Sequence, residues 1–230
     1  MYINTNDIYI IIPCFNEQQT IRGVVNSLLQ LGYVHIVVVD DGSATPLQTV
    51  LQDLPIIYIR HAANLGQGAA LQTGISYARS QNALYAVTFD ADGQHRAGDI
   101  PELVLPLLSG VADVTMGSRF LAKEGQEVPF SKKIILQLAR FINFAFSGML
   151  LSDAHNGLRA FNKKAIDTVV ITENRMAHAS EILLEIKKHK LQIKEVPVRV
   201  LYSHYSIEKG QSAFDSIKIL FDLVLHKLFR

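Results

Sequence analysis

Short apolar runs alternate with segments of helical periodicity along the first half of this chain. The runs are rich in β-branched residues and apolar at nearly every position: "IYIIIP", "HIVVVD", "IIYIR", "LYAVTF" and "ADVTMG". Between them, segments such as "EQQTIRGVVNSLLQL" and "GQGAALQTGISYARS" place apolar residues at helical spacing. Strands joined through helices run parallel and are covered on both faces, which explains why they do not alternate in polarity. The pattern predicts an α/β fold, with a mainly parallel central sheet flanked by helices.

The composition fits one globular domain over residues 1–230. Hydrophobic residues make up 49% of the chain and charged residues 19%, which is enough apolar material for a sizeable core. The first α/β unit is expected to reach about Phe120, and the strand-like "LQIKEVPVRVLY" is expected to complete the fold after the polar segment "AKEGQEVPFSKK". A formal net charge of +1 gives no sign of a nucleic-acid partner. The single cysteine, Cys14, and the absence of a signal-peptide pattern lead us to expect a cytoplasmic protein.

Two segments in the second half of the chain have broad apolar stripes at helical spacing. They are "IILQLARFINFAFSGMLL", residues 134–151, and "AFDSIKILFDLVLHKLF", residues 213–229. Polar residues interrupt the first segment at helical intervals, which argues against a membrane span. Two interpretations stay open for both: a helix buried in the core, or an amphipathic helix at a membrane interface, with Lys132 and Lys133 near anionic head groups.

Polar side chains follow three of the predicted strands. The carboxyl ends of parallel strands meet at one edge of a sheet, where ligands bind, so these side chains are expected to lie together. They are Asn16 and Glu17, Asp40 and Asp41, and Asp90 and Asp92. Acids placed repeatedly at a ligand-binding edge indicate a cation that offsets their mutual repulsion.

The segment "TFDADGQH" carries two of these acids one residue apart. One interpretation is a tight turn, because Asp and Gly favour the backbone angles of a chain reversal. The other is a divalent metal site in which Asp90 and Asp92 share a hard cation. The acids that end the other strands favour the metal site.

Two further segments each allow two interpretations. In "VVVDDGS", the acids either form an Asp-Gly turn or accept hydrogen bonds from a ribose or a base. In "HAANLGQGAALQTG", Gly66 and Gly68 either let a phosphate or sugar approach a helix N-terminus or let that helix pack tightly on the sheet. A dinucleotide fingerprint would need a third glycine at Leu71, so a Rossmann dehydrogenase is disfavoured.

Six motifs in the same order resemble a known family. They are "IIPCFNE", "VVVDDGS", "NLGQGAALQTG", "DADGQH", "GSRF" and "HNGLRAF", between about Ile8 and Val200. Together they resemble a family 2 glycosyltransferase of the GT-A fold, close to the dolichyl-phosphate mannose synthase and polyprenyl-phosphate glycosyltransferase branch. The resemblance implies a sheet that binds a nucleotide diphosphosugar, glycosyl transfer with inversion, and Mg²⁺ or Mn²⁺ on the diphosphate. It also implies that residues 1–120 form the nucleotide-sugar half and residues 121–230 the acceptor half.

The resemblance carries over to individual positions. It assigns the donor nucleotide sugar to Pro13, Asn16, Glu17, Asp40, Asp41, Gly66, Gly68 and Asp90. It assigns the metal ion to Asp92 and Gln94, together with Asp90, and leaves His95 as either a site residue or a surface histidine. It assigns the acceptor side to Arg119, Asp153, Asn156, Gly157 and Arg159.

The chemistry of glycosyl transfer fits these residue types. Negative charge develops on the diphosphate leaving group, and a divalent ion with an arginine such as Arg119 would stabilise it. A hydroxyl acceptor would also need a general base, for which Asp153 is the candidate. A lipid phosphate is already an anion and needs no base, but cationic groups such as Lys132, Lys133 and His204 would guide it.

We therefore expect an inverting hexosyltransferase that moves a sugar from a UDP- or GDP-sugar to polyprenyl phosphate, peripheral on the cytoplasmic face of the membrane. Many relatives carry transmembrane helices after the catalytic domain; their absence before Arg230 suggests direct membrane contact or a membrane partner protein. An arginine of some lipid-phosphate enzymes aligns with Ser203 or His204, which leaves the acceptor open. The alternatives are transfer to a hydroxyl of a cell-surface glycan or lipid-linked saccharide and a catalytically idle nucleotide-binding subunit. A nucleotidyltransferase ranks below these, because no lysine-bearing activation loop follows the first run.

Overall fold

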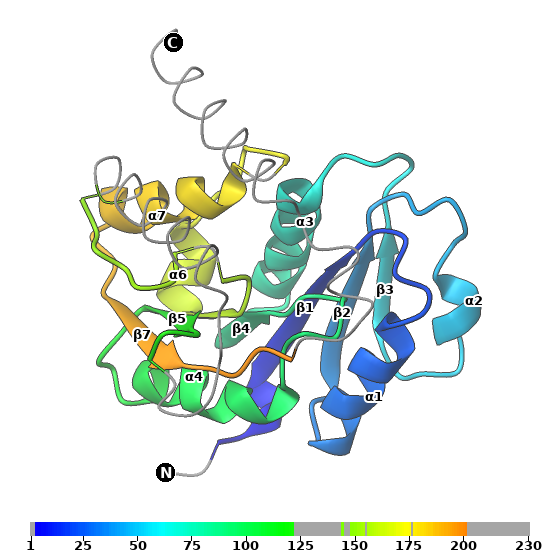
Figure 1. The fold of residues 1–230 in the computed structure, drawn as a ribbon, viewed down its shortest axis with the longest axis horizontal. Coiled ribbons are helices and arrows are strands. Elements are labelled where there is room, and N and C mark those ends of the chain that lie inside the picture. Colours follow the sequence, from blue (N-terminus) through cyan, green and yellow to red (C-terminus); the bar gives the residue numbers. More distant parts are fainter. Residues whose placement is uncertain (1–2, 122–143, 145–147, 155, 176, 202–230) are drawn as a thin grey trace, which may run out of the picture.

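The protein is an α/β structure built on one central sheet, shown by a computed structural model that describes residues 3–121, 144, 148–154, 156–175 and 177–201 (Figure 1). Within these residues the sheet has seven strands in the order β3-β2-β1-β4-β6-β5-β7. The strands are β1 (Ile8–Cys14), β2 (His35–Asp40), β3 (Ile57–Arg60), β4 (Tyr85–Thr88), β5 (Val114–Ser118), β6 (Arg159–Asn162) and β7 (Ile193–Pro197). The predicted fold class is confirmed, and the five apolar runs of the sequence correspond to β1–β5.

Helices cover both faces of the sheet. They are α1 (Ile21–Gln30), α2 (Gln48–Leu51), α3 (Gln67–Ser80), α4 (Ile100–Leu108), α6 (Lys163–Thr168) and α7 (His178–Lys188), with short 3₁₀ turns η1 (Thr5–Asp7) and η2 (Ala97–Asp99). Apolar residues of α1 and α4 pack in one core cluster, and those of α3, α6 and α7 pack in another. Successive residues of β1 point into opposite clusters: Ile10 and Ile12 into the first, Ile11 into the second. A strand buried on both faces has no polar face, which accounts for its uninterrupted apolar run.

Strand β6 is the one antiparallel strand among those described. It pairs with β4 on one side and β5 on the other, with Arg159 opposite both Thr88 and Met116. Its first residue therefore lies at the edge where β4 and β5 end. Since β6 belongs to the second half of the chain and lies between strands of the first half, the two halves share one sheet.

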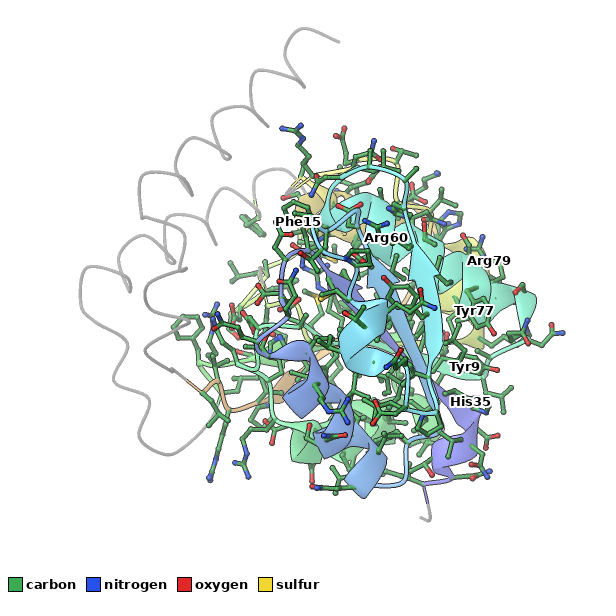
Figure 2. The ribbon with its side chains drawn as sticks, turned by 90° about the vertical axis from the view of Figure 1, so that its right-hand side faces the viewer. Tyr9, Phe15, His35, Arg60, Tyr77 and Arg79 are labelled. Atoms are coloured by element: carbon green, nitrogen blue, oxygen red, sulfur yellow. The ribbon has the colours of Figure 1, made fainter. Side chains whose placement is uncertain are left out.

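The strand order reverses between β1 and β4. Moving away from β1, the order along the sheet runs to β2 and β3 on one side and to β4 on the other. A crevice at such a reversal, beyond the carboxyl ends of the strands, is where open α/β sheets bind ligands. Figure 2 shows Phe15 and Arg60 at this carboxyl edge, with Tyr9 and His35 towards the opposite edge.

The predicted helix over residues 134–151 is wrong at its C-terminal end. Phe144 is helical, but residues 148–151 are not. The N–H group of Gly148 donates to the carbonyl oxygen of Phe144 at 2.8 Å, and Gly148 has a φ of 72°. A glycine in this left-handed conformation ends a helix. The rest of that segment, Lys132, Lys133, His204 and the stripe over residues 213–229 lie outside the described residues.

None of the helices in the described residues is both long and apolar enough to cross a membrane.

Candidate active site

The polar residues predicted at the strand ends meet at the carboxyl edge of the sheet. Asn16 and Glu17 follow β1, Asp40 ends β2, and Asp90 comes two residues after β4. Arg119 follows β5 directly. Because β6 runs the other way, residues 156–159 reach the same edge from its beginning. The strand order thus brings the polar residues after β1, β2 and β4 together, as expected, and places Arg119 and residues 156–159 at the same edge.

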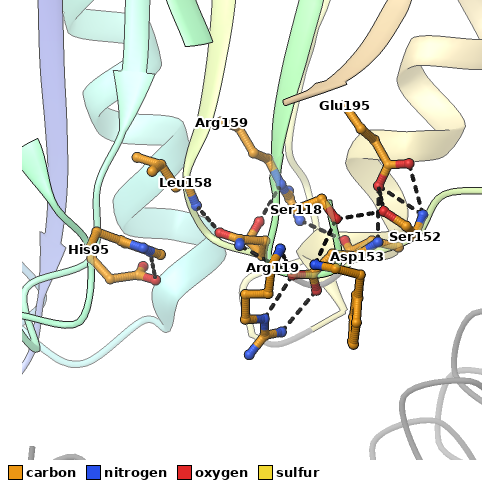
Figure 3. A network of polar contacts seen from close by, with 12 residues as sticks. His95, Ser118, Arg119, Ser152, Asp153, Leu158, Arg159 and Glu195 are labelled. Atoms are coloured by element: carbon orange, nitrogen blue, oxygen red, sulfur yellow. Dashed lines mark hydrogen bonds and ion pairs between the residues drawn. The ribbon is translucent and has the colours of Figure 1, made fainter. Parts of the chain in front are cut away.

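Asp90 lies at the strand reversal, in contact with three segments. Its Oδ2 atom accepts a hydrogen bond from His95 Nε2 at 2.8 Å (Figure 3). Its Oδ1 atom accepts one from Gln67 Nε2 at 3.3 Å. Gly157 lies so close that a Cβ atom there would be 2.8 Å from the Asp90 Cγ. Burial alone would raise the pKa of Asp90, but the hydrogen bond and charge of His95, with the charge of Arg159, hold it below its ordinary value. Asp90 is therefore an oriented carboxylate.

Asp92 differs from Asp90 in its electrostatics. Burial and then the negative charge of Asp90 raise the pKa of Asp92 above its ordinary value. Its Oδ1 atom accepts the backbone N–H of Gln94 at 2.9 Å, which closes the turn that follows β4. The segment is thus a tight turn, and the two neighbouring carboxylates that it presents are compatible with the metal-site interpretation.

The donor set suits a divalent ion that is held mainly by substrate. Among the described residues no group of three or more His, Cys, Asp or Glu side chains could hold a metal ion. Mg²⁺ is commonly held by one or two carboxylates together with substrate phosphates, and it does not require an all-protein cage. Asp90, Asp92 and the amide oxygen of Gln94 are hard ligands of this kind. The residues present therefore fit an ion that arrives with a diphosphate.

On the acceptor side, Arg119 and Asp153 form a bidentate ion pair. Arg119 Nε donates to Asp153 Oδ2 at 2.7 Å, and Arg119 Nη2 donates to Asp153 Oδ1 at 2.9 Å (Figure 3). The backbone N–H of Arg119 also donates to Asp153 Oδ2, at 3.1 Å. Burial of Asp153 would raise its pKa, but the bonds and charge of Arg119 lower it below the ordinary value. A carboxylate with a low pKa and two occupied oxygens is a poor general base.

A second arginine, Arg159, is buried between the two acidic centres. Its Nε and Nη2 atoms donate to the carbonyl oxygens of Asn156 and Ala154, at 3.0 and 3.1 Å. Burial lowers its pKa to about 10, while the charges of Asp90 and Asp153 act in the opposite direction. At that pKa the guanidinium stays charged near neutral pH. It therefore supplies a fixed positive charge beside both carboxylates.

Asn156 shapes the turn that leads into β6. Its side chain is buried; Nδ2 donates to Asp153 Oδ2 at 3.3 Å, and Oδ1 accepts the N–H of Leu158 at 2.9 Å. Both polar ends of the amide are thus engaged within the protein. This geometry supports a role in positioning Asp153.

Among the predicted nucleotide residues at the end of β1, Asn16 connects the loop after β1 to the loop after β2. Pro13 is buried within β1. Asn16 has a φ of 56°, a left-handed conformation that Asn tolerates better than most residues. Its backbone N–H donates to Ser43 Oγ at 2.9 Å, and its Oδ1 atom accepts the N–H of Ala44 at 3.0 Å. Glu17 Oε2 accepts the hydroxyl of Thr20 at 3.1 Å.

Asp40 and Asp41 reach the carboxyl edge, but their carboxylates point into the protein. Asp40 accepts hydrogen bonds from the Ser43 N–H at 2.9 Å and the Tyr58 hydroxyl at 2.6 Å, and it pairs with Arg60 Nε at 3.3 Å. Burial would raise the pKa of Asp40, but its hydrogen bonds from Ser43 and Tyr58 lower it below the ordinary value. Of the two interpretations of "VVVDDGS", these contacts support a structured turn for Asp40.

Asp41 organises the loop that leads into α3. It accepts hydrogen bonds from the N–H groups of Leu65 and Gly66, at 3.0 and 2.7 Å, and from His61 Nδ1 at 2.7 Å. His61 Nε2 in turn contacts Thr73 Oγ1 at 2.9 Å. To contact a base or ribose, the Asp41 carboxylate would have to break some of these hydrogen bonds within the protein.

The glycines at the start of α3 face another segment of the chain. The carbonyl oxygen of Asn174 accepts the N–H groups of Gly68 and Ala69, at 2.8 and 3.3 Å. A Cβ atom on Gly66 or Gly68 would collide with the backbone around Asn174. The structure thus supports tight packing of this helix end, because its first N–H groups already have a partner.

The sequence left the place of His95 open and did not single out His178 or Glu195. His95, with its side chain buried against Phe89 at 5.5 Å between ring centroids, is not a surface histidine. His178 donates through Nδ1 to the carbonyl oxygen of Arg175 at 2.8 Å, and burial, then the charge of Arg159, lowers its pKa to about 4. Glu195 on β7 contacts the segment before Asp153. No local pattern marks Glu195, since its partners Ser152 and Asp153 lie 43 and 42 residues away in the chain.

The comparisons with known proteins agree with this geometry. A model described as Glycosyl transferase family 2 matches residues 9–170. The chain is 36% identical to an uncharacterized protein of Methanocaldococcus jannaschii, MJ1222, over 99% of this chain and 95% of the relative. It is 35% identical to the UDP-N-acetylglucosamine--dolichyl-phosphate N-acetylglucosaminyltransferase of Methanococcus voltae, over 96% of both chains.

Among solved structures, the glucosyl-3-phosphoglycerate synthase of Mycobacterium tuberculosis, in complex with Mn²⁺, UDP and glucosyl-3-phosphoglycerate, has the same fold. The TM-score is 0.68 and the identity 18%, covering 94% of this chain and 79% of that chain. The sheet with its acidic carboxyl edge, the matching family model and the similarity to relatives over nearly their whole length lead to one conclusion. This chain belongs to glycosyl transferase family 2 and has the GT-A fold.

Proposed function

We propose that this protein is an inverting glycosyltransferase that transfers a hexose-type sugar from a UDP- or GDP-sugar to polyprenyl phosphate. The Methanococcus voltae relative is named for transfer from a UDP-sugar to dolichyl phosphate, which supports this donor and acceptor class. The observation that carries the proposal is the state of Asp153. Its carboxylate is bound on both oxygens by Arg119, and its pKa is held low. The acceptor side therefore combines two guanidinium groups, those of Arg119 and Arg159, with one carboxylate that is a poor base, which suits an acceptor that is already an anion.

The residues of the site have distinct parts in this reaction. An oxygen of the acceptor phosphate attacks C1 of the donor sugar on the face opposite the diphosphate, and the C1–O bond to the diphosphate breaks with its electron pair. Arg119 and Arg159 attract the acceptor phosphate and oppose the repulsion between it and the leaving group. Asp90, Asp92 and Gln94 would hold Mg²⁺ or Mn²⁺. When bound, that ion neutralises the charge that develops on the nucleoside diphosphate.

The location and partners belong to the same proposal. Polyprenyl phosphate resides in a membrane, so the protein works at the cytoplasmic membrane face, either by direct contact or through a membrane partner protein. Residues 134–151 and 213–229 remain candidates for direct contact. Binding to vesicles with anionic lipid that weakens with added salt would support direct contact, whereas no binding at low salt would point to a partner.

The test is a screen of UDP- and GDP-sugars with Mn²⁺ or Mg²⁺, with and without a short polyprenyl phosphate. We expect release of the nucleoside diphosphate that depends on both the metal and the lipid phosphate. Transfer to a saccharide hydroxyl and not to the lipid phosphate would contradict the acceptor. No metal-dependent nucleotide binding at all would indicate an idle subunit and overturn the enzymatic proposal.

A further inference from the structure

Glu195 makes a dense set of hydrogen bonds beside the Arg119–Asp153 pair. Its Oε1 atom accepts from the backbone N–H of Ser152 at 2.8 Å, the Ser152 hydroxyl at 2.7 Å and the N–H of Asp153 at 3.0 Å (Figure 3). Its Oε2 atom also accepts from the Ser152 N–H, at 2.9 Å. Glu195 lies on β7, opposite Met116 of β5, so a rigid strand fixes the start of its side chain. One carboxylate thus fixes two consecutive residues of the loop that carries Asp153.

A chain of hydrogen bonds links Glu195, through Ser152 and Ser118, to the residues on both sides of Arg119. A carboxylate only accepts, so the Ser152 hydroxyl donates to Glu195. The Ser118 hydroxyl, 2.6 Å from that of Ser152, must then donate to Ser152. Ser118 Oγ in turn accepts the N–H of Phe120 at 3.2 Å. Ser118 and Phe120 flank Arg119, so the chain of hydrogen bonds that ends at Glu195 holds the backbone around both partners of the ion pair.

We propose that Glu195 is a positioning residue that sets the orientation of Arg119 and Asp153 for the acceptor, without touching the substrate itself. The effect of Glu195 on sugar transfer rests on the proposed function, whereas its effect on the orientation of Arg119 and Asp153 does not. Arg119 is a long side chain with many rotamers, and its fork fits phosphate only when it is held in place. The geometry assigns that task to the path from Glu195 through residues 152 and 153.

The protein contains a matched control for this proposal. Glu181 on α7 accepts the backbone N–H groups of Thr172, at 3.0 and 3.1 Å, and of Glu173, at 2.8 Å, together with the Thr172 hydroxyl. The pattern is the same as at Glu195: two consecutive N–H groups and the hydroxyl of the first residue. The loop that Glu181 holds packs on the start of α3, not on Arg119. Removing either glutamate therefore costs similar hydrogen bonds at different places.

The first measurement needs no substrate. NMR of the arginine Nε–H groups follows the hydrogen bond from Arg119 to Asp153, through its chemical shift and its exchange with water. In Glu195→Ala we expect exchange of the Arg119 Nε–H to rise about tenfold, as the loss of a charge-assisted hydrogen bond implies. In Glu181→Ala the Arg119 signal should stay as in the wild type. An unchanged Arg119 signal in Glu195→Ala, or an equal change in Glu181→Ala, would overturn the proposal.

The second measurement separates an effect on the acceptor side from an effect on binding of the donor nucleotide sugar. With a donor and acceptor found by the screen, Glu195→Ala should lose about 100-fold in turnover while KM for the nucleotide sugar stays within about twofold, because a shift of about 1 Å in the acceptor arginine suffices for such a loss. Glu195→Gln should recover most of the turnover, because its amide oxygen can keep the three bonds of Oε1. Equal losses in the alanine and glutamine variants would contradict positioning by these bonds.

If Glu195→Ala does not fold, Ser152→Ala breaks the same chain of hydrogen bonds and keeps both backbone N–H groups. Arg119 Nε–H exchange should then rise by a smaller factor, and no rise would overturn the proposal. An altered Arg119 signal in a protein that transfers no sugar would leave Glu195 in its positioning role and refute only the proposed function.

Discussion

Gly157 is the position where a single methyl group should disturb the metal side of the site. In Gly157→Ala, the new Cβ would collide with the Oδ2 atom of Asp90 and lie 2.8 Å from its Cγ and Oδ1 atoms, whereas ordinary contact begins at 3.4 Å. The carboxylate must therefore move by about 0.6 Å or more, which disturbs the hydrogen bond that its Oδ2 atom accepts from His95 Nε2 at 2.8 Å. Gly157 has no left-handed φ, so alanine adds no backbone strain there.

We expect Gly157→Ala to fold, at a cost of about 1–3 kcal/mol in the free energy of unfolding, as is typical of overpacking. Nucleotide binding with Mn²⁺ should weaken, and turnover should fall by about 100-fold, because the misplaced Asp90 no longer meets the diphosphate in the right geometry. Calorimetric titration with UDP or GDP in the presence and absence of Mn²⁺ measures the first effect, and the transfer assay measures the second.

Gly98→Ala is the matched control, since a Cβ on Gly98 meets nothing within 4 Å. Gly98→Ala adds the same methyl group a few residues after Asp90 and Asp92 in the sequence. It should leave binding and turnover as in the wild type. If Gly157→Ala kept wild-type, metal-dependent nucleotide binding, the role we assign to Asp90 would be refuted.

Three further perturbations test other parts of the site. Asp92→Asn should weaken metal-dependent nucleotide binding by about 10–100-fold, measured by the same titration; unchanged binding would argue against Asp92 as a ligand. Asp153→Asn should lower turnover by releasing Arg119, yet leave the pH dependence of the remaining transfer unchanged, because no proton is taken from the acceptor. If the variant instead lost the fall in turnover at low pH that a general base produces, a hydroxyl acceptor would be favoured. Asp40 has a lowered pKa in the folded protein, so its stabilisation is present above its unfolded pKa of about 4 and is lost as the pH falls through the folded value. Tyr58→Phe removes a 2.6 Å bond to that carboxylate, so it should lower the free energy of unfolding by about 1.5–3 kcal/mol at pH 7, and by less in acid, in denaturant titrations.

The central strands β1 and β2 were predicted from a property that is local in the sequence. Runs such as Ile8–Cys14 are apolar because both faces are covered, and that requirement leaves a local mark in the sequence. β6 left no such mark. It is four residues long, begins with a buried arginine and exists because β4 and β5 both pair with it from distant parts of the chain. The helix that ends before Gly148 was extended too far, because apolar spacing alone does not reveal a left-handed φ.

For the acidic residues of the site, too, the sequence predicted the position in the fold but not the contacts of each side chain. Turn residues after apolar runs predicted that Asp40, Asp41 and Asp90 would reach one edge, and they do. What each carboxylate does there depends on partners far away in the chain, such as Tyr58 for Asp40 and Gly66 for Asp41. Those partners belong to the backbone and to side chains of the predicted nucleotide half, whereas the partners of Asp90 are the side chains of His95 and Gln67.

By itself, the sequence determined the fold class and the edge of the sheet where the candidate site lies, because periodicity and strand ends are local properties. Only the tertiary structure decided which carboxylates already have partners, that Asp153 is bound by Arg119, and that Glu195 holds the loop between them. Hydrogen bonds and pKa values depend on neighbours in space, and no local pattern in the chain encodes which distant residues those will be.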